Sequence, residues 1–212
     1  MEGKNEKEIK GKLTQEGLRA ESVKTIAGIT YRQIFEWEKR GLILSQKRET
    51  ENSWRNFTGI DVIILTVISL LKEKGMTIIK LKKLYDWMNT EKWLNYLLKN
   101  VFRFGSEMYL ITDLNNSFLL LPAEDLEDHI FTLGTEPVII LRLNPILKSV
   151  YETLELPFPE AKIDREKNDW KKVVENIKRR IKTNPHQKLM LLIRSGKVVN
   201  MKAETDQNLD IL

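Results

Sequence analysis

The side chains in this sequence best suited to chemistry are basic, amide and aromatic groups between residues 30 and 55. Arg32 and Gln33 stand at the start of a short amphipathic stretch, residues 31–40, whose apolar positions have helical spacing. A guanidinium at the exposed start of a helix can bind a phosphate or a guanine, and an amide there can reach a base edge. Solvated surface side chains are the plain alternative, but the surrounding pattern favours contact with nucleic acid.

A compact arrangement of helices and turns must position these groups. Gly28 and Thr30 predict a tight turn that caps the helix over residues 31–40, after a shorter helix. Gly41 ends that helix, and a polar basic segment within residues 43–57 predicts a β-hairpin. Two helices joined by a glycine turn form a helix-turn-helix, whose second helix enters the major groove, with the hairpin as a wing.

At these residues the sequence resembles the MerR family of winged-helix transcription regulators. The family's helix pattern is matched by Thr30, Arg32, Ile34, Trp37, Glu38, Lys39, Arg40, Gly41 and Leu42. Its pattern at the end of the wing is matched by Trp54, Arg55, Phe57, Thr58 and Asp61. The break between the next two helices is matched by Gly75-Met76-Thr77. The resemblance covers roughly residues 20–90 and departs at Phe35 and Glu36, where the family often has Arg and Tyr.

The pattern and the resemblance together predict a set of DNA-contacting side chains. The set is Thr30, Tyr31, Arg32, Gln33, Trp37, Lys39, Lys47, Arg48, Trp54 and Arg55. Tyr31 and Gln33 are expected at base edges, and Trp37 either at a phosphate or packed on the wing. The resemblance also implies a homodimer on a pseudo-palindromic site of double-stranded DNA, with promoter distortion as the regulatory act.

Composition limits the remaining possibilities. The chain has 212 residues, a net charge of +5 and no cysteine, so it can bury a core but can hold neither disulfides nor thiolate metal sites. No apolar run approaches the roughly 20 residues of a membrane-spanning helix, and residues 1–12 lack a signal-peptide pattern. We therefore expect a cytoplasmic protein without a membrane partner.

The predicted fold class is α+β, with an N-terminal winged helix-turn-helix DNA-binding domain followed by a smaller α+β domain. Residues 1–19 read as a polar tail, residues 20–102 as the winged domain with a connecting helix, and residues 103–212 as the second domain. Strands are expected in the second domain at residues 108–112, 118–121 and 138–143 and in a terminal hairpin at 188–202; helices are expected at 145–154 and 164–182.

The second domain is expected to hold the dimer together. The helical pattern that starts after Thr90 ends near Phe102, which is too short for a stable coiled coil. Dimerisation, a small-molecule effector pocket and a protein contact all remain open as roles of residues 103–212. An apolar effector pocket is one reading of its aromatic residues, and a plain core is the other.

No phosphate-binding loop, nucleophile elbow or paired metal-ligand motif occurs in the sequence, so we expect no enzyme activity, cofactor or metal. Some serine recombinases also begin with a MerR-like DNA-binding module. Such an enzyme needs a catalytic serine, but none of Ser106, Ser117, Ser149 and Ser195 lies in a recognisable nucleophile motif. An accessory or architectural DNA-binding factor without an effector, as in excision or partition, is the main alternative to a regulator. A small-molecule-dependent change in DNA affinity would separate the two.

Overall fold

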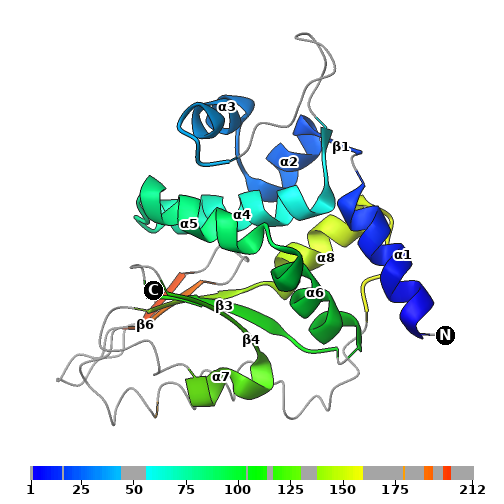
Figure 1. Ribbon diagram of the computed structural model, residues 1–212. Helices are drawn as coiled ribbons and strands as arrows, with labels where there is room; N and C mark the ends of the chain where they lie inside the picture. Colours follow the sequence, from blue (N-terminus) through cyan, green and yellow to red (C-terminus); the bar gives the residue numbers. More distant parts are fainter. Residues whose placement is uncertain are drawn as a thin grey trace. The chain divides into compact units, whose positions relative to one another are not determined.

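The computed structural model describes residues 2–15, 17–43, 56–103, 105–113, 117–129, 138–159, 179, 189–192 and 198–201 (Figure 1). The chain forms two compact units. The first comprises Met1–Leu98 and Ile146–Phe158, and the second Lys99–Pro145 and Pro159–Leu212. Residues 146–158 thus belong with the N-terminal unit, although they lie within the range that the sequence assigns to the second domain.

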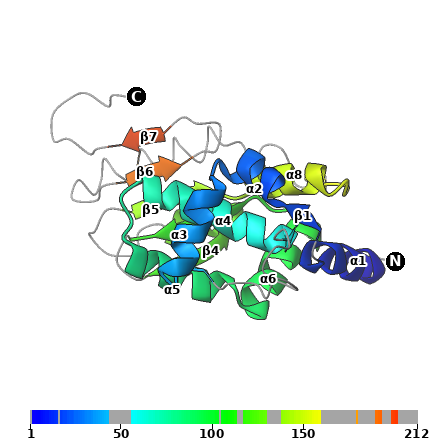
Figure 2. The ribbon, with the colours of Figure 1, turned by 90° about the horizontal axis from the view of Figure 1, so that it is seen from above.

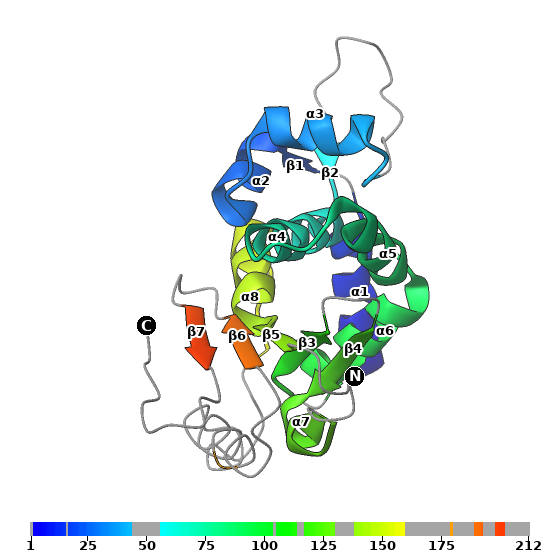
Figure 3. The same ribbon diagram turned by 90° about the vertical axis from the view of Figure 1, so that its left-hand side faces the viewer.

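The first unit is helical, with one short pair of strands. Its elements are α1 (Glu2–Thr14), β1 (Leu18–Arg19), α2 (Ala20–Ala27), α3 (Tyr31–Lys39), β2 (Asn56–Phe57), α4 (Gly59–Glu73), α5 (Ile78–Met88), α6 (Glu91–Leu98) and most of α8 (Asn144–Thr153). Helix α4 contacts α1, α2 and α5 (Figure 3). Eleven residues of α4 are buried, including its whole central run from Val62 to Ser69, so α4 is the core of the unit.

Helix α1 and the end of α8 pack closely against the N-terminal end of α4. A Cβ atom added to Gly59 would lie 2.9 Å from Leu13 Cδ2 of α1 and 2.9 Å from Leu154 Cδ1, just after α8. Glycine at this position therefore permits the close packing. Thr58 closes the end of α4 with a capping box, in which Asp61 Oδ2 accepts from the Thr58 backbone N–H at 2.8 Å.

Strands β1 and β2 pair antiparallel, with Leu18 opposite Phe57 and Arg19 opposite Asn56. Leu18 and Phe57 are both buried. Because β1 leads directly into α2 and β2 is followed by α4, this ladder ties the start of the helix-turn-helix to the start of the core helix. The sequence predicts the end of a wing at residue 57 but not the pairing with residues 18–19.

Helix α1 occupies the stretch for which the sequence predicts a polar tail. It forms a helix because Ile9 and Leu13, four residues apart, lie on one face and are both buried. Helix α2 begins at Ala20; its N-cap residue is Arg19, whose side chain makes no capping hydrogen bond.

The second unit contains a five-stranded mixed sheet. Its elements are η1, a π-helical turn (Lys99–Arg103), β3 (Met108–Thr112), β4 (Phe118–Pro122), α7 (Ala123–His129), β5 (Val138–Arg142), β6 (Leu189–Leu192) and β7 (Val198–Met201). The strand order is β4-β3-β5-β6-β7, and of the four pairings only β5–β6 is parallel. Figure 2 shows β5, β6 and β7 side by side.

These elements confirm the predicted α+β class. They also confirm the expected strands, including the terminal hairpin formed by β6 and β7. Helix α7, which contacts β3 and β4, was not predicted. The expected helix at 164–182 lies almost wholly outside the described residues. The helical pattern that begins at α6 ends with η1 at Arg103, close to the predicted end near Phe102.

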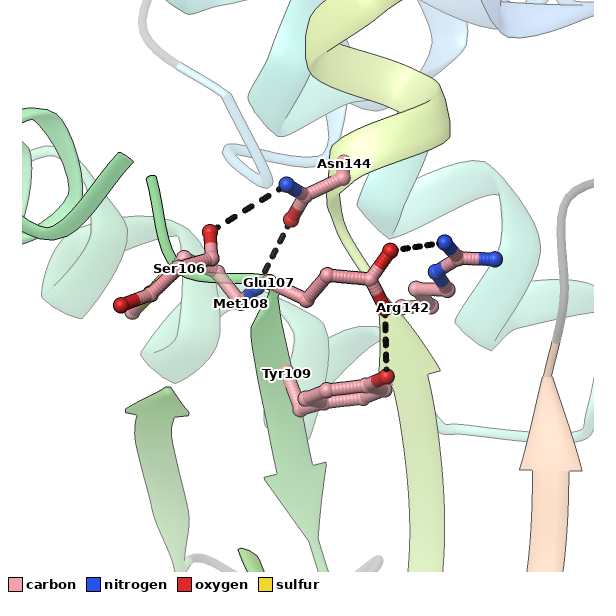
Figure 4. A network of polar contacts seen from close by, with 6 residues as sticks. All are labelled: Ser106, Glu107, Met108, Tyr109, Arg142 and Asn144. Carbon is pink, nitrogen blue, oxygen red and sulfur yellow. Dashed lines mark hydrogen bonds and ion pairs between the residues drawn. The ribbon is translucent and has the colours of Figure 1, made fainter. Parts of the chain in front are cut away.

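A polar network holds the start of β3 to the end of β5 (Figure 4). Glu107 forms an ion pair with Arg142 and accepts a hydrogen bond from the Tyr109 hydroxyl at 2.9 Å. Burial raises the pKa of Tyr109 above its usual range, and the neighbouring Glu107 carboxylate raises it further. The hydroxyl therefore stays protonated and donates to Glu107 across the neutral pH range.

Asn144 links two stretches of backbone within the same network. Its Oδ1 accepts from the Met108 N–H at 2.7 Å, and its Nδ2 donates to the Ser106 carbonyl at 3.3 Å (Figure 4). The Met108 carbonyl in turn accepts from the Leu143 N–H at 2.8 Å. Since Met108 is fully buried, its N–H depends on Asn144 for a partner.

We expect Asn144→Ala to lower the free energy of unfolding by about 1–3 kcal/mol, because it leaves the buried Met108 N–H unsatisfied. Asn144→Asp retains an acceptor for that N–H, so its free energy of unfolding should fall clearly less. Urea unfolding of both variants measures the difference. Equal losses for the alanine and aspartate variants would contradict the role given to Oδ1.

Candidate nucleic-acid interface

The turn between α2 and α3 is built by one glycine and one buried isoleucine. Gly28 ends α2 in the left-handed conformation, with φ of 68°, and its N–H donates to the Lys24 carbonyl at 2.9 Å. Ile29 is fully buried and anchors the turn. Thr30 is extended and serves as the N-cap of α3. The predicted helix, glycine turn and second helix are therefore present at the predicted positions (Figure 1).

Thr30 and Gln33 close a capping box at the start of α3. Gln33 Oε1 accepts from the Thr30 N–H at 2.7 Å and from the Thr30 hydroxyl at 2.9 Å, while the Thr30 hydroxyl oxygen accepts from the Gln33 N–H at 3.3 Å. The box supplies partners for groups that a helix start leaves unpaired. Gln33 thus has a structural role in addition to any contact with a base, and only its amide nitrogen remains for such a contact.

The inner face of α3 packs into the core. Ile34 is fully buried and Trp37 is 1% exposed. The Lys72 ammonium of α4 lies 5.1 Å from the centroid of the Trp37 ring, within cation–π range. Trp37 was predicted among the DNA-contacting residues; because it is buried it offers DNA no surface, so we correct its role to anchoring α3.

The outer face of α3 presents a different set of side chains. Tyr31 and Phe35 are each 47% exposed. Arg32 and Lys39 are exposed as well. Residues 31, 35 and 39 follow one another at helical spacing of four and Arg32 lies next to them, so these side chains share one face.

This face is basic. The first turn of α3 contains no acidic residue, which leaves the positive end of the helix dipole uncompensated there. Glu36 lies next to the basic face, but it pairs with Arg40: the distance between its carboxylate oxygen and the Arg40 Nε is 3.9 Å. Arg32, Lys39 and Arg40 outnumber Glu36 and Glu38 on this part of the chain, with Arg32 and Lys39 on the exposed face itself, and a polyanion is the ligand that such a face attracts.

The predicted wing residues Lys47, Arg48, Trp54 and Arg55 lie outside the described residues, and their contact with DNA stays a prediction. What the structure describes is the end of that segment. Phe57 is buried in the ladder with β1, so the chain returns from residues 44–55 to a fixed point next to α2.

Sequence reasoning missed two features of this interface. The capping role of Gln33 has a recognisable signal, because Thr30 followed three residues later by Gln is the pattern of a capping box. The exposure of Phe35 also has a recognisable signal in the sequence, because helical spacing places position 35 on the side of Tyr31 and away from Ile34.

Among the described residues, no group of histidine, aspartate and glutamate side chains is arranged to bind a metal ion. Within the same part of the chain, no helix has the length and apolar character that crossing a membrane requires.

The model of the MerR HTH family regulatory proteins matches residues 18–86 of the sequence. No curated protein matches the sequence at a significant level. The matched range begins at β1 and ends within α5, so it contains the turn, the capped helix α3 and the core helix α4. Residues 18–86 of this chain therefore match a MerR-family helix-turn-helix module, and this match supports a DNA-binding transcription regulator.

Proposed function

We propose that this protein binds double-stranded DNA sequence-specifically through the outer face of α3 and regulates transcription as a homodimer that distorts promoter DNA. One observation carries the proposal. A capped helix presents Tyr31, Arg32, Phe35 and Lys39 on one exposed face, while its other face is fixed to the core. A rigid helix whose basic side chains face solvent is the element that helix-turn-helix proteins insert into the major groove.

The spacing of the two basic residues suits this groove. Arg32 and Lys39 are seven residues apart, a separation of about 10 Å along a helix axis. The major groove is roughly 12 Å wide and admits an α-helix, so two cations at this separation on one side of the helix can contact phosphates along the backbone that borders it. The proposed contact set on this helix is Thr30, Tyr31, Arg32, Gln33 and Lys39, and the wing adds Lys47, Arg48, Trp54 and Arg55.

The second unit is the proposed site of dimerisation and of any effector or partner contact. Helix α6 has only eight residues before η1, too few for a stable coiled coil. In the described sheet, β4 and β7 are the outer strands, and an outer strand can pair across a two-fold axis. Two copies would place two α3 helices on the half-sites of a pseudo-palindrome.

We expect Arg32→Ala and Lys39→Ala each to weaken binding to all duplexes, because each removes one phosphate contact per subunit. The slope of log affinity against log salt concentration should flatten by about 1.8 for a dimer, from about 0.9 for each lost contact. Titration of a labelled duplex at several salt concentrations measures the slope. The matched control is Lys92→Ala, an exposed lysine on α6, which should leave the slope unchanged.

If Arg32→Ala and Lys39→Ala both kept the wild-type affinity and slope, α3 would not be the DNA-binding element. A full-length protein that binds no duplex in genome-wide or random-library selection would contradict the proposed function itself.

We expect Gln33→Ala to lower the free energy of unfolding by about 1 kcal/mol, because it removes the acceptor from the capping box. Gln33→Glu should keep the stability, since glutamate closes the same box. Because its oxygen is committed to Thr30, Gln33 mainly positions the helix and can meet DNA only through its amide nitrogen, which we place at the phosphate backbone. The alanine variant should therefore weaken all DNA sequences alike. Urea unfolding and a binding profile over single-base variants measure the two effects. Loss of preference at one base pair alone would show that Gln33 reads that base.

A further inference from the structure

Phe35 is a large apolar side chain on the face of α3 that we assign to DNA. It is 47% exposed. The core on the inner side of α3 is already filled by Ile34 and Trp37, both buried. Stability thus gives little reason for a phenylalanine at position 35. Together with Tyr31, one turn away and equally exposed, Phe35 forms an apolar patch on a basic surface, and such a patch marks a binding site for a ligand with apolar groups.

We propose that Phe35 is a specificity-determining residue that contacts the C5-methyl group of thymine in the major groove; this rests on the proposed function. A phenyl ring has no hydrogen-bond donor or acceptor, so it cannot read the polar edges of the bases. Thymine presents the methyl group of the major groove, and apolar contact with that methyl is an established way to distinguish thymine from the other bases.

The position of Phe35 within α3 places it where bases would lie. Arg32 precedes it by three residues and Lys39 follows it by four, so both lie on the same side of the helix as Phe35. When the two cations hold the phosphate backbone, Phe35, which lies between them along the helix axis, is held against the DNA on the same side. The charge around Phe35 therefore selects DNA as the occupant rather than an apolar protein surface.

Tyr31 lies one turn before Phe35 on the same face and is equally exposed. Its ring is also apolar, but its hydroxyl can bind a phosphate or a polar base edge. The two aromatic residues are thus distinguishable, because only removal of the Phe35 ring should abolish discrimination of the methyl group.

The experiment compares thymine with deoxyuridine, which lacks only the C5-methyl group. The full-length wild-type protein first selects its site from a random duplex library, and each thymine of that site is then replaced by deoxyuridine. We expect one position in each half-site at which the replacement weakens wild-type binding roughly fourfold, as expected for loss of one buried methyl group. Phe35→Ala should bind more weakly and show no thymine preference at that position.

Three further variants serve as controls. Phe35→Leu keeps an apolar side chain and should retain part of the discrimination. Tyr31→Ala, and Tyr96→Ala on α6, where the tyrosine is 40% exposed, should retain all of it. Circular dichroism before each titration verifies that every variant is folded.

Two results would overturn the inference and leave the proposed function standing: wild-type binding that no deoxyuridine replacement affects, or a Phe35→Ala variant that still prefers thymine at the same position. A wild-type protein that selects no DNA would overturn both the inference and the proposed function.

Discussion

Helix α4 is apolar around most of its circumference, and the rest of the N-terminal unit is arranged to cover it. Its central residues, Val62 to Ser69, are buried without interruption, whereas an ordinary surface helix buries one stripe. Covering a helix on all sides requires several partners, which α1, α2, α5 and the stretch around Leu154 provide. The helix-turn-helix is one of the elements packed around α4, so its orientation is set by this packing rather than by the turn alone.

This constraint separates structure from function on α3. Ile34 and Trp37 face inward, and Trp37 is further held by the Lys72 ammonium of α4. Every side chain proposed to meet DNA from this helix lies elsewhere on its circumference or at its capped start. A helix fixed in this way presents its outer face without the cost of ordering it on binding, which is how a preorganised surface gains affinity.

The sequence was informative where one strong local signal decides the structure. Gly28, Thr30 and Gly41 mark the turn and both ends of α3, and apolar runs mark β3, β4 and β5. The sequence was less informative where contacts between residues far apart in the chain determine the structure. Helix α1 is stabilised by the burial of Ile9 and Leu13 and by its contact with α4. The ladder of β1 and β2 joins residues about 40 positions apart, and the pairing of Glu107 with Arg142 spans 35 residues. Packing was one of the two alternatives for Trp37, which follows the buried Ile34 by three residues; an amphipathic pattern alone does not show which neighbouring element covers the aromatic ring.

The most direct test of the central claim, that the outer face of α3 is the DNA-binding surface, is site-directed photo-crosslinking. A photoreactive phenylalanine analogue is placed at position 35 of the full-length protein or, as the matched control, at position 96 on α6, which also carries an exposed aromatic residue. Irradiation with the bound duplex should crosslink position 35 to DNA and leave position 96 uncrosslinked. A bound duplex that crosslinks from position 96 but not from position 35 would contradict the account.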